Sequence, residues 1–178
     1  IGMNDGKVNL IENNKISVFP IKTKLPEVRV FNILRDKRKN VWFSTFNGLL
    51  KLSADGQETL LTKEQGLPDN SIRITYEDQQ GNIWIGTRWG GVAKIDLEGK
   101  ISIYNKKSGL NSNFIMSIRG DQAGNVWIGT NDAGVNVINP DGTVRGYTVS
   151  QGMVSNLVFN TYTDKQGVTW IVTNGGLS

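Results

Sequence analysis

The side chains of this sequence that could take part in chemistry are carboxylates, amides, arginines and aromatic rings, because the chain contains no cysteine and no histidine. Without these two residue types it has no thiolate nucleophile, no disulfide, and no imidazole to act as a general base or a metal ligand. Its acidic residues do not cluster at the spacing of a metal site. The remaining chemistry is hydrogen bonding, charge attraction and ring stacking, which favours ligand binding over catalysis.

The residues that could bind a ligand fall in short polar segments between apolar runs. In the segment "TRWGG" an arginine precedes a tryptophan, and a tight turn does not require a tryptophan, so Trp89 either contacts a ligand or partner or packs locally. Phe46, Arg88 and Trp89 offer stacking and charge, while neighbouring segments offer hydrogen bonds. The full set of candidate binding residues is Phe46, Asn47, Asp69, Asn70, Arg88, Trp89, Asn113, Asn131, Asp132 and Asn156.

This mixture of rings and polar groups suits a carbohydrate, whose apolar faces stack on aromatic rings and whose hydroxyl groups need directed partners. Arg88 would suit an acidic sugar through charge-assisted hydrogen bonds. For Asn70, Asn113 and Asn156 a second interpretation stays open and is the more common one, because asparagine after a tight turn usually serves backbone geometry. We expect no metal and no cofactor.

The net charge of +4 is unevenly distributed. Residues 1–51 contain ten Lys or Arg and four Asp or Glu, and the rest of the chain is slightly acidic. The basic run "RDKRK" at residues 35–39 falls in an expected turn and has no interleaved aromatic residues, unlike sites for single-stranded nucleic acid. The sequence therefore predicts a solvated turn there and no nucleic-acid partner.

The elements that position these residues follow from an internal repeat. Its clearest marker is a tryptophan at spacings of 42, 43 and 43 residues: Trp42, Trp84, Trp127 and Trp170. An apolar residue stands 17 positions before each tryptophan (Leu25, Leu67, Leu110 and Met153), and a threonine stands three positions after it (Thr45, Thr87, Thr130 and Thr173). Such a fixed period is typical of propellers and solenoids.

Each period reads as four short strands separated by turn residues. In the second full copy these are "SIRITYED", "IWIGT", "VAKID" and "ISIYN", which predicts a four-stranded antiparallel meander. One such sheet cannot bury both of its faces, whereas sheets stacked around an axis cover each other, so we predict an all-β protein, a β-propeller with about four blade repeats. Each repeated tryptophan is then a knob packed between sheets, and the repeated aspartate and glycine before it form a turn.

Because turns in a meander alternate between the two ends of a sheet, the loop after the second strand and the connection between blades share one end. All ten candidate residues fall in these two kinds of segment. We expect a partial blade at 1–21, blades at 22–65, 66–108 and 109–151, and a partial blade at 152–178. The two cuts fall in the same part of the repeat, which predicts a fragment of a larger propeller. Two alternatives are a mixed blade formed within one molecule or between two molecules.

The pattern "GLPDNSI", then "EDQQGNIWIGT", then a glycine turn and "KID", resembles the two-component regulator propeller repeat. This resemblance implies a periplasmic sensor domain of a hybrid two-component system of Bacteroidetes, in which blades precede a membrane span and a histidine kinase. The partners would be an oligosaccharide or other small ligand, the kinase region of the full-length protein, and a second copy in a homodimer. We expect no membrane contact by this segment.

The repeat does not specify the ligand, because function on such scaffolds depends on the loops. The main alternative is a propeller that serves as a protein-protein interaction scaffold. The third is a propeller enzyme, a lyase or glycosidase, although a lyase that depends on histidine is excluded by composition. We therefore expect this segment not to be an enzyme.

Overall fold

Short antiparallel strands joined by tight turns make up most of the chain. The computed structural model describes residues 8–23 and 29–178. Leu25, the apolar residue 17 positions before Trp42, lies outside them. The strands are β1 (Asn9–Glu12), β2 (Lys15–Val18), β3 (Val30–Arg35), β4 (Val41–Thr45), β5 (Gly48–Leu52), β6 (Glu58–Leu61), β7 (Ile72–Glu77), β8 (Ile83–Thr87), β9 (Val92–Ile95), β10 (Ile101–Tyr104), β11 (Ile115–Gly120), β12 (Val126–Thr130), β13 (Val135–Ile138), β14 (Val144–Tyr147), β15 (Val158–Thr163), β16 (Thr169–Thr173) and β17 (Gly176–Leu177).

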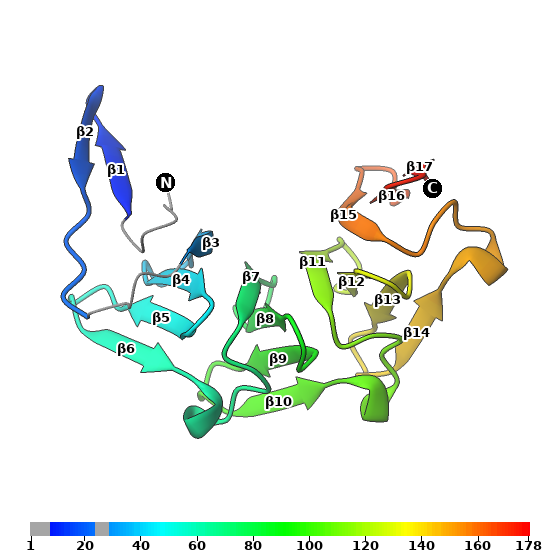
Figure 1. Ribbon diagram of the computed structural model, residues 1–178, viewed down its shortest axis with the longest axis horizontal. Helices are drawn as coiled ribbons and strands as arrows, with labels where there is room; N and C mark the ends of the chain where they lie inside the picture. The colour runs from blue at the N-terminus through cyan, green and yellow to red at the C-terminus, as the bar shows by residue number, and fades with distance from the viewer. Residues whose placement is uncertain (1–7, 24–28) are drawn as a thin grey trace.

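Consecutive strands pair into separate antiparallel sheets, as the repeat predicts. Three sheets have four strands each, in the order β3 to β6, β7 to β10 and β11 to β14, while β15 to β17 form a three-stranded sheet and β1 and β2 a hairpin. The first strand of each larger sheet lies on the inner side of an arc and the fourth on its outer side (Figure 1). The predicted all-β fold with four-stranded antiparallel propeller blades is confirmed.

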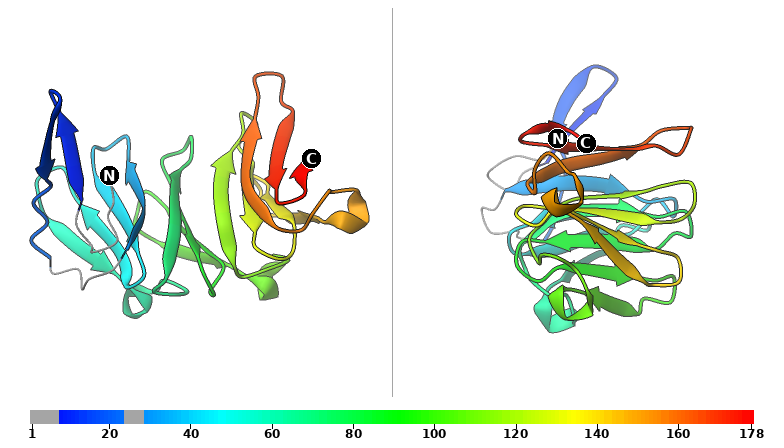
Figure 2. Two further views of the ribbon diagram at one scale, coloured as in Figure 1. Left: turned by 45° about the horizontal axis from the view of Figure 1, so that its top comes forward. Right: turned by 90° about the vertical axis from the view of Figure 1, so that its right-hand side faces the viewer.

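The hydrophobic core lies between successive sheets, which follow one another as layers (Figure 2). Central strands such as β8 are buried along their whole length, because a neighbouring sheet covers each face. One core cluster joins Trp42 and Leu49 of the first complete sheet to Ile83 and Ile85 of the second. Trp84 occupies the corresponding place in the next cluster. The tryptophans of these two sheets are therefore packing residues, as predicted.

Each repeated aspartate has a second role that the sequence did not reveal. As expected, Asp78 accepts a hydrogen bond from a local backbone amide, that of Asn82, at 2.9 Å. Its other oxygen also accepts from the indole Nε1 of Trp84 at 2.7 Å. The same indole bond recurs in the other three copies, to Asp36, Asp121 and Asp164. The turn between the first two strands is thus fastened to the repeated tryptophan, which is in the core in the first two complete sheets.

The first strand of each blade carries a β-bulge at its loop end. The register shifts between residues 30 and 32, 72 and 74, 115 and 117, and 158 and 160. The extra residues at these shifts are Phe31, Arg73, Met116 and Phe159. Since a bulge changes the direction of the side chain it carries, it can turn a residue of the inner strand away from the regular pleat.

Three short 3-10 helices follow the outer strands: η1 (Lys63–Gln65), η2 (Lys106–Ser108) and η3 (Val149–Gln151). Each one begins with a capping box and ends at a glycine with positive φ, such as Gly66 at 99°. In the part of the chain that the structure describes, no helix has the length and apolar character needed to cross a membrane.

The partial units at the two ends of the chain do not combine into one blade in the described residues. The β1–β2 hairpin and the β15–β17 sheet are separate, and the arc stays open between them (Figure 1). Sheet β15–β17 packs against β11 and continues the arc, while Val8, beside β1, packs with Phe43 at the other end. The hypothesis of a mixed blade within one molecule is therefore wrong for this structure. The C-terminal unit has a third strand of two residues, β17.

Candidate ligand-binding site

The loops after the second strand and the connections between blades meet at one end of the sheets, which we call the loop end. The backbone N–H of Trp89 donates to Asp69 Oδ2 at 2.9 Å, and that of Arg88 donates to the carbonyl of Ser71 at 2.9 Å. The opposite end, which carries the Asp–Trp bonds, is the turn end. All ten predicted site residues thus lie in segments of the loop end, as the meander topology requires.

Three of the predicted residues come together at the loop end. The guanidinium of Arg88 lies 5.8 Å from the ring centroid of Phe46 and 5.1 Å from that of Trp89. Trp89 makes an edge contact with Phe114 at 5.0 Å between centroids, yet 62% of its surface is exposed. The ring therefore packs locally on one edge and leaves most of its surface open, and its contact with a ligand or partner stays a prediction.

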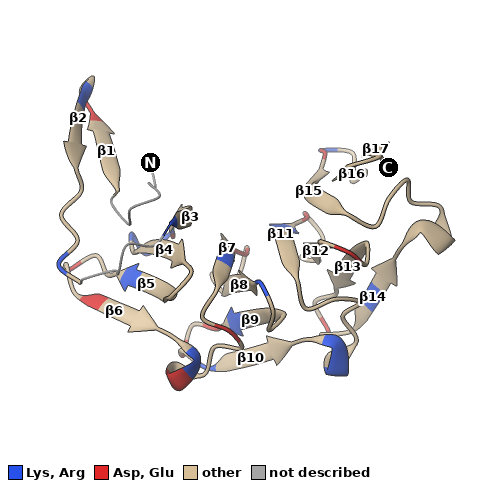
Figure 3. Ribbon diagram, in the orientation of Figure 1, with Lys and Arg blue, Asp and Glu red and all other residues tan. Residues whose placement is uncertain are grey.

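Four residues that we did not predict complete this group. Phe31 contacts Phe46 edge-on at 4.6 Å, and the guanidiniums of Arg29 and Arg73 lie 5.2 and 5.6 Å from the Phe31 centroid. We call the whole set the arginine–aromatic cluster: Arg29, Phe31, Phe46, Arg73, Arg88, Trp89 and Phe114. Figure 3 shows the basic positions that β7 and the β8–β9 loop contribute.

One signal in the sequence could have identified these residues. The residues that flank the buried start of each first strand change type from copy to copy: Arg29, Ser71, Phe114 and Leu157 on one side, and Phe31, Arg73, Met116 and Phe159 on the other. Variation beside a constant apolar position is typical of a surface that does not hold the fold. The bulge then brings this surface toward the loops.

The cluster brings three positively charged arginines together. Burial, followed by the charges of Arg88 and Arg29, lowers the pKa of Arg73 from its ordinary value. The Nε atom of Arg88 is buried and has no hydrogen-bond partner. Contacts between a cation and a ring face are worth about 0.5–1 kcal/mol at exposed sites, so the rings offset only part of the cost of bringing these charges together.

The repeated asparagines of the loop end serve the backbone. Asn70 Oδ1 accepts from the backbone N–H of Lys63 at 2.8 Å, and Asn113 and Asn156 make the equivalent bonds to the first residues of η2 and η3. Each asparagine thus holds a 3-10 helix to the connection that follows it. The structural interpretation of Asn70, Asn113 and Asn156 accounts for their position.

The other four predicted residues are near the loops but outside the cluster. Asp69 accepts from the backbone N–H groups of Ser71 and Trp89 and so shapes the β8–β9 loop. The backbone N–H of Asn47 donates to Thr45 Oγ1, and that of Asn131 donates to the carbonyl of Phe114. Asp132 is exposed.

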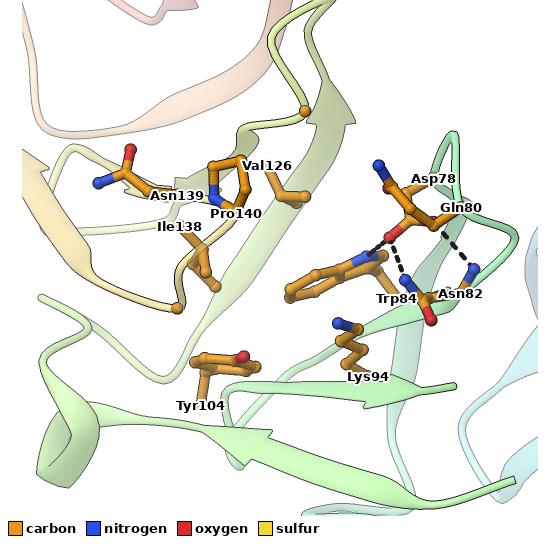
Figure 4. Close-up of a pocket in the computed structure, with 12 residues that line it drawn as sticks. Asp78, Gln80, Asn82, Trp84, Lys94, Tyr104, Val126, Ile138, Asn139 and Pro140 are labelled. Atoms are coloured by element: carbon orange, nitrogen blue, oxygen red, sulfur yellow. Dashed lines mark hydrogen bonds between the residues drawn. The ribbon is translucent and has the colours of Figure 1, made fainter. Parts of the chain in front are cut away.

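A cavity at the turn end is a competing candidate. It lies between the second and third complete sheets, has a volume of about 180 Å³, and is lined by residues that include Trp84, Lys94, Tyr104 and Asn139 (Figure 4). The bonds of Asp78 to Trp84 and Asn82 already satisfy its carboxylate. A smaller cavity with the same Trp, Asn and Asp columns occurs at the preceding interface. Because it recurs with the packing, we assign this cavity to the repeat and the candidate site to the loop end.

Metal binding finds no support in the geometry of the described residues. Across ranges 8–23 and 29–178, no group of three or more acidic residues is placed to hold an ion. The chemistry that the loop end can perform is stacking, hydrogen bonding and attraction of negative charge.

Comparison with known proteins identifies the repeat. The family model described as "Two component regulator propeller" matches residues 24–47, 66–89 and 109–132. In these three segments the chain carries the two-component regulator propeller repeat. Each matched segment ends in the loop after a second strand, at Asn47, Trp89 and Asp132. No curated protein matches the chain.

Solved extracellular domains assigned to hybrid two component systems resemble 98% of the chain. The extracellular domain assigned to the hybrid two component system BT3049 of B. thetaiotaomicron is 33% identical, with a TM-score of 0.79 over 98% of this chain and 24% of that one. The extracellular domain assigned to BT4673 of the same organism is 22% identical, with a TM-score of 0.76 over 98% of this chain and 24% of that one. This chain spans about a quarter of the length of both.

A solved propeller that is an enzyme is similar to this chain in fold alone. Virginiamycin B lyase from Staphylococcus aureus is 18% identical, with a TM-score of 0.72 over 98% of this chain and 62% of the lyase. At that identity the similarity shows how the blades are built and nothing about chemistry. The matched repeats therefore identify the scaffold, and the loop end of that scaffold is the candidate site.

Proposed function

We propose that this chain is part of the periplasmic sensor domain of a hybrid two-component system. In this proposal its loop end binds an oligosaccharide, and a histidine kinase outside the chain receives the signal. The repeats and the similarity to extracellular domains assigned to such systems support the sensor class. The loop end supports the ligand, because it combines exposed ring surface with polar groups.

The observation that carries the proposal is the exposure of Trp89. Trp89 packs on one edge only and leaves 62% of its surface in water, and the other copies place Asn47, Asp132 or Gly175 at this point of the repeat. The bond from its backbone to Asp69 holds the loop that presents the ring. A sugar ring stacked on the open indole face would remove apolar surface of both partners from water.

The cluster also offers a way to couple binding to a change in shape. Its residues come from three successive blades, through β3, the β8–β9 loop and the segment before β11. A ligand can shift a conformational equilibrium only by binding one state better than the other. A ligand that spans these blades would favour one placement of them, and the change would then pass to the rest of the sensor.

The test is a binding screen with a matched control variant. Calorimetry with oligosaccharides of four to six sugars should find a ligand whose affinity falls at least tenfold in Trp89→Ala. Tyr162→Ala is the control, because Tyr162 is equally exposed, at 62%, but belongs to β15 outside the cluster. The proposal fails if Trp89→Ala binds every ligand as the wild type does, or if Tyr162→Ala loses affinity by the same factor.

A second candidate function is contact with another protein, and the outer face of the β15–β17 sheet favours it. Trp170, Val172 and Leu177 are exposed there beside Tyr162, although the equivalent tryptophans of the first two complete sheets are buried. Apolar surface gathered in this way is typical of an interface. A solution mass equal to two chains that drops to one in Trp170→Asp would support this function, and a monomeric wild type would remove the dimer.

A further inference from the structure

The three guanidinium groups of the cluster contact the same aromatic rings in pairs. Arg29 and Arg73 both lie over Phe31, at 5.2 and 5.6 Å from its centroid. Arg73 and Arg88 both lie near Phe114, at 5.7 and 5.5 Å. The three positive charges are therefore linked through two rings. Neighbouring like charges repel each other. This repulsion lowers the stability of the folded state unless a negative charge offsets it.

No carboxylate compensates these charges within the part of the chain that the structure describes. Arg29, Arg73 and Arg88 make no ion pair there. Asp69, which belongs to the same loop end, already accepts from two backbone N–H groups. The buried Nε of Arg88 lacks any acceptor. A buried donor without a partner is costly, so the needs of the fold do not explain why Arg88 is placed here.

The fold sets the backbone position of each of the three arginines. The bulge in β7 sets the direction of Arg73. The backbone N–H of Arg88 is bonded to the carbonyl of Ser71, which fixes the start of the β8–β9 loop. Arg29 directly precedes β3, and Val30, the first residue of β3, is buried in the core. The fold thus sets the backbone positions of the three arginines, and the ring contacts describe where their guanidiniums lie.

We propose that Arg29, Arg73 and Arg88 form an anion subsite that binds carboxylate or sulfate groups of an oligosaccharide. The planar fork of each guanidinium suits two oxygens of such a group. Phe46 and Trp89 then contact the sugar rings beside the charged groups. This inference rests on the proposed function, in which the loop end binds an oligosaccharide, and adds that the ligand carries at least two negative charges.

The experiment measures binding of four defined probes to the whole chain by calorimetry. These are tetragalacturonate for carboxylate, a κ-carrageenan tetrasaccharide for sulfate, maltotetraose as a neutral oligosaccharide, and an oligothymidylate of ten residues. We expect at least one of the two acidic probes to bind ten times or more tighter than maltotetraose. Its affinity should fall several-fold when salt rises from about 50 to 200 mM, because salt screens charge attraction.

Variants then assign the charge preference to named residues. Arg73→Gln and Arg88→Gln should each weaken the acidic probe at least tenfold, which is about 1.4 kcal/mol. Arg119→Gln is the matched control, because Arg119 is exposed on β11 and lies outside the cluster. It should bind like the wild type. Equal melting temperatures of the variants and the wild type show that folding is intact.

Two patterns of results overturn the subsite in different ways. If the neutral probe binds as well as the acidic ones and is weakened by Trp89→Ala but not by Arg73→Gln, the anion subsite is wrong and the proposed function survives. If none of the three oligosaccharides binds, or if the oligothymidylate binds tighter than all of them, both are overturned. If an acidic probe binds and Arg119→Gln weakens it as much as Arg73→Gln, the charge acts through the whole surface and the assigned subsite is wrong.

Discussion

The two ends of the same blades treat their charged groups in opposite ways. At the turn end, Asp78 is buried and accepts from Asn82 and Trp84, so its carboxylate is satisfied within one blade. At the loop end, Arg73 and Arg88 are partly buried, lie against rings and pair with no described acid. The turn end repeats because it holds the fold together, whereas the side chains of the arginine–aromatic cluster vary from copy to copy because the fold does not depend on them.

One short segment contains both behaviours. Residues 81–91 read "GNIWIGTRWGG" and residues 124–134 read "GNVWIGTNDAG", so the first seven positions are nearly constant and the rest change. Trp84 in the constant part is 3% exposed, and Trp89, five residues later, is 62% exposed. Two tryptophans in one hairpin thus have different tasks, and substitutions that compare them test this difference.

The largest expected effect is on stability at the turn end. Trp84→Ala should lower the free energy of unfolding by about 3–5 kcal/mol, because it leaves a cavity in the core between two sheets. Trp89→Ala should lower it by no more than about 1 kcal/mol, since only one edge of the ring is packed. Urea denaturation of both variants measures the difference. Similar losses in the two variants would contradict the division between the ends.

The next effect concerns the aspartate that bonds the core tryptophan. Asp78→Ala should cost about 1–3 kcal/mol, because it leaves the indole Nε1 of Trp84 and the side chain of Asn82 without their acceptor. Asp132→Ala, which removes an exposed carboxylate at the loop end, should change stability by less than about 0.5 kcal/mol. Chemical denaturation at pH 7 compares the two, and a larger loss in Asp132→Ala would reverse the roles.

A smaller effect is expected from pH. Burial opposes ionisation of Asp121, but hydrogen bonds from Trp127 and Asn125 hold the pKa of its carboxyl below the ordinary value. A folded-state pKa below the unfolded one adds stability at pH values above the unfolded pKa, about 3.9, and this gain is lost as pH falls through the folded pKa. The wild type should therefore lose stability below about pH 4, and Asp121→Asn should show a shallower loss. Denaturation at several pH values checks this, and parallel curves would contradict it.

The smallest effect is expected at the loop end. Arg73→Gln removes contacts with Phe31 and Phe114 but also relieves burial and repulsion of its charge. These opposing contributions should leave the free energy of unfolding within about 0.5 kcal/mol of the wild type. A loss of several kcal/mol, measured in urea, would show that Arg73 is structural and would weaken the case for a binding surface.

The fold could be predicted from the sequence because its determinants are local and repeated. The spacing of Trp42, Trp84 and Trp127 sets the period of packing, and the turn residues mark the strands within each period. The bond between each tryptophan and its aspartate could not be predicted, because it joins positions six residues apart across a turn. The formation of a turn already explained why an aspartate recurs at this position of the repeat.

The candidate site could be predicted only in part. Phe46, Arg88 and Trp89 lie in loops that the repeat exposes, and the structure brings them together. Phe31 and Arg73 belong to the inner strands β3 and β7, and a bulge in each strand, which the alternation of residues does not reveal, places them in the same group. Asn70 illustrates the reverse case, because a cap on a 3-10 helix, rather than a ligand, explains its position.

The most direct test of the account is thermal unfolding of the wild type and Trp89→Ala, each with and without the oligosaccharide that binds the wild type. A ligand that binds only the folded state raises the melting temperature by mass action. The account predicts nearly equal melting temperatures without ligand, and a rise with ligand in the wild type that Trp89→Ala lacks. It is contradicted if Trp89→Ala melts far below the wild type without ligand, or if the ligand raises both melting temperatures equally.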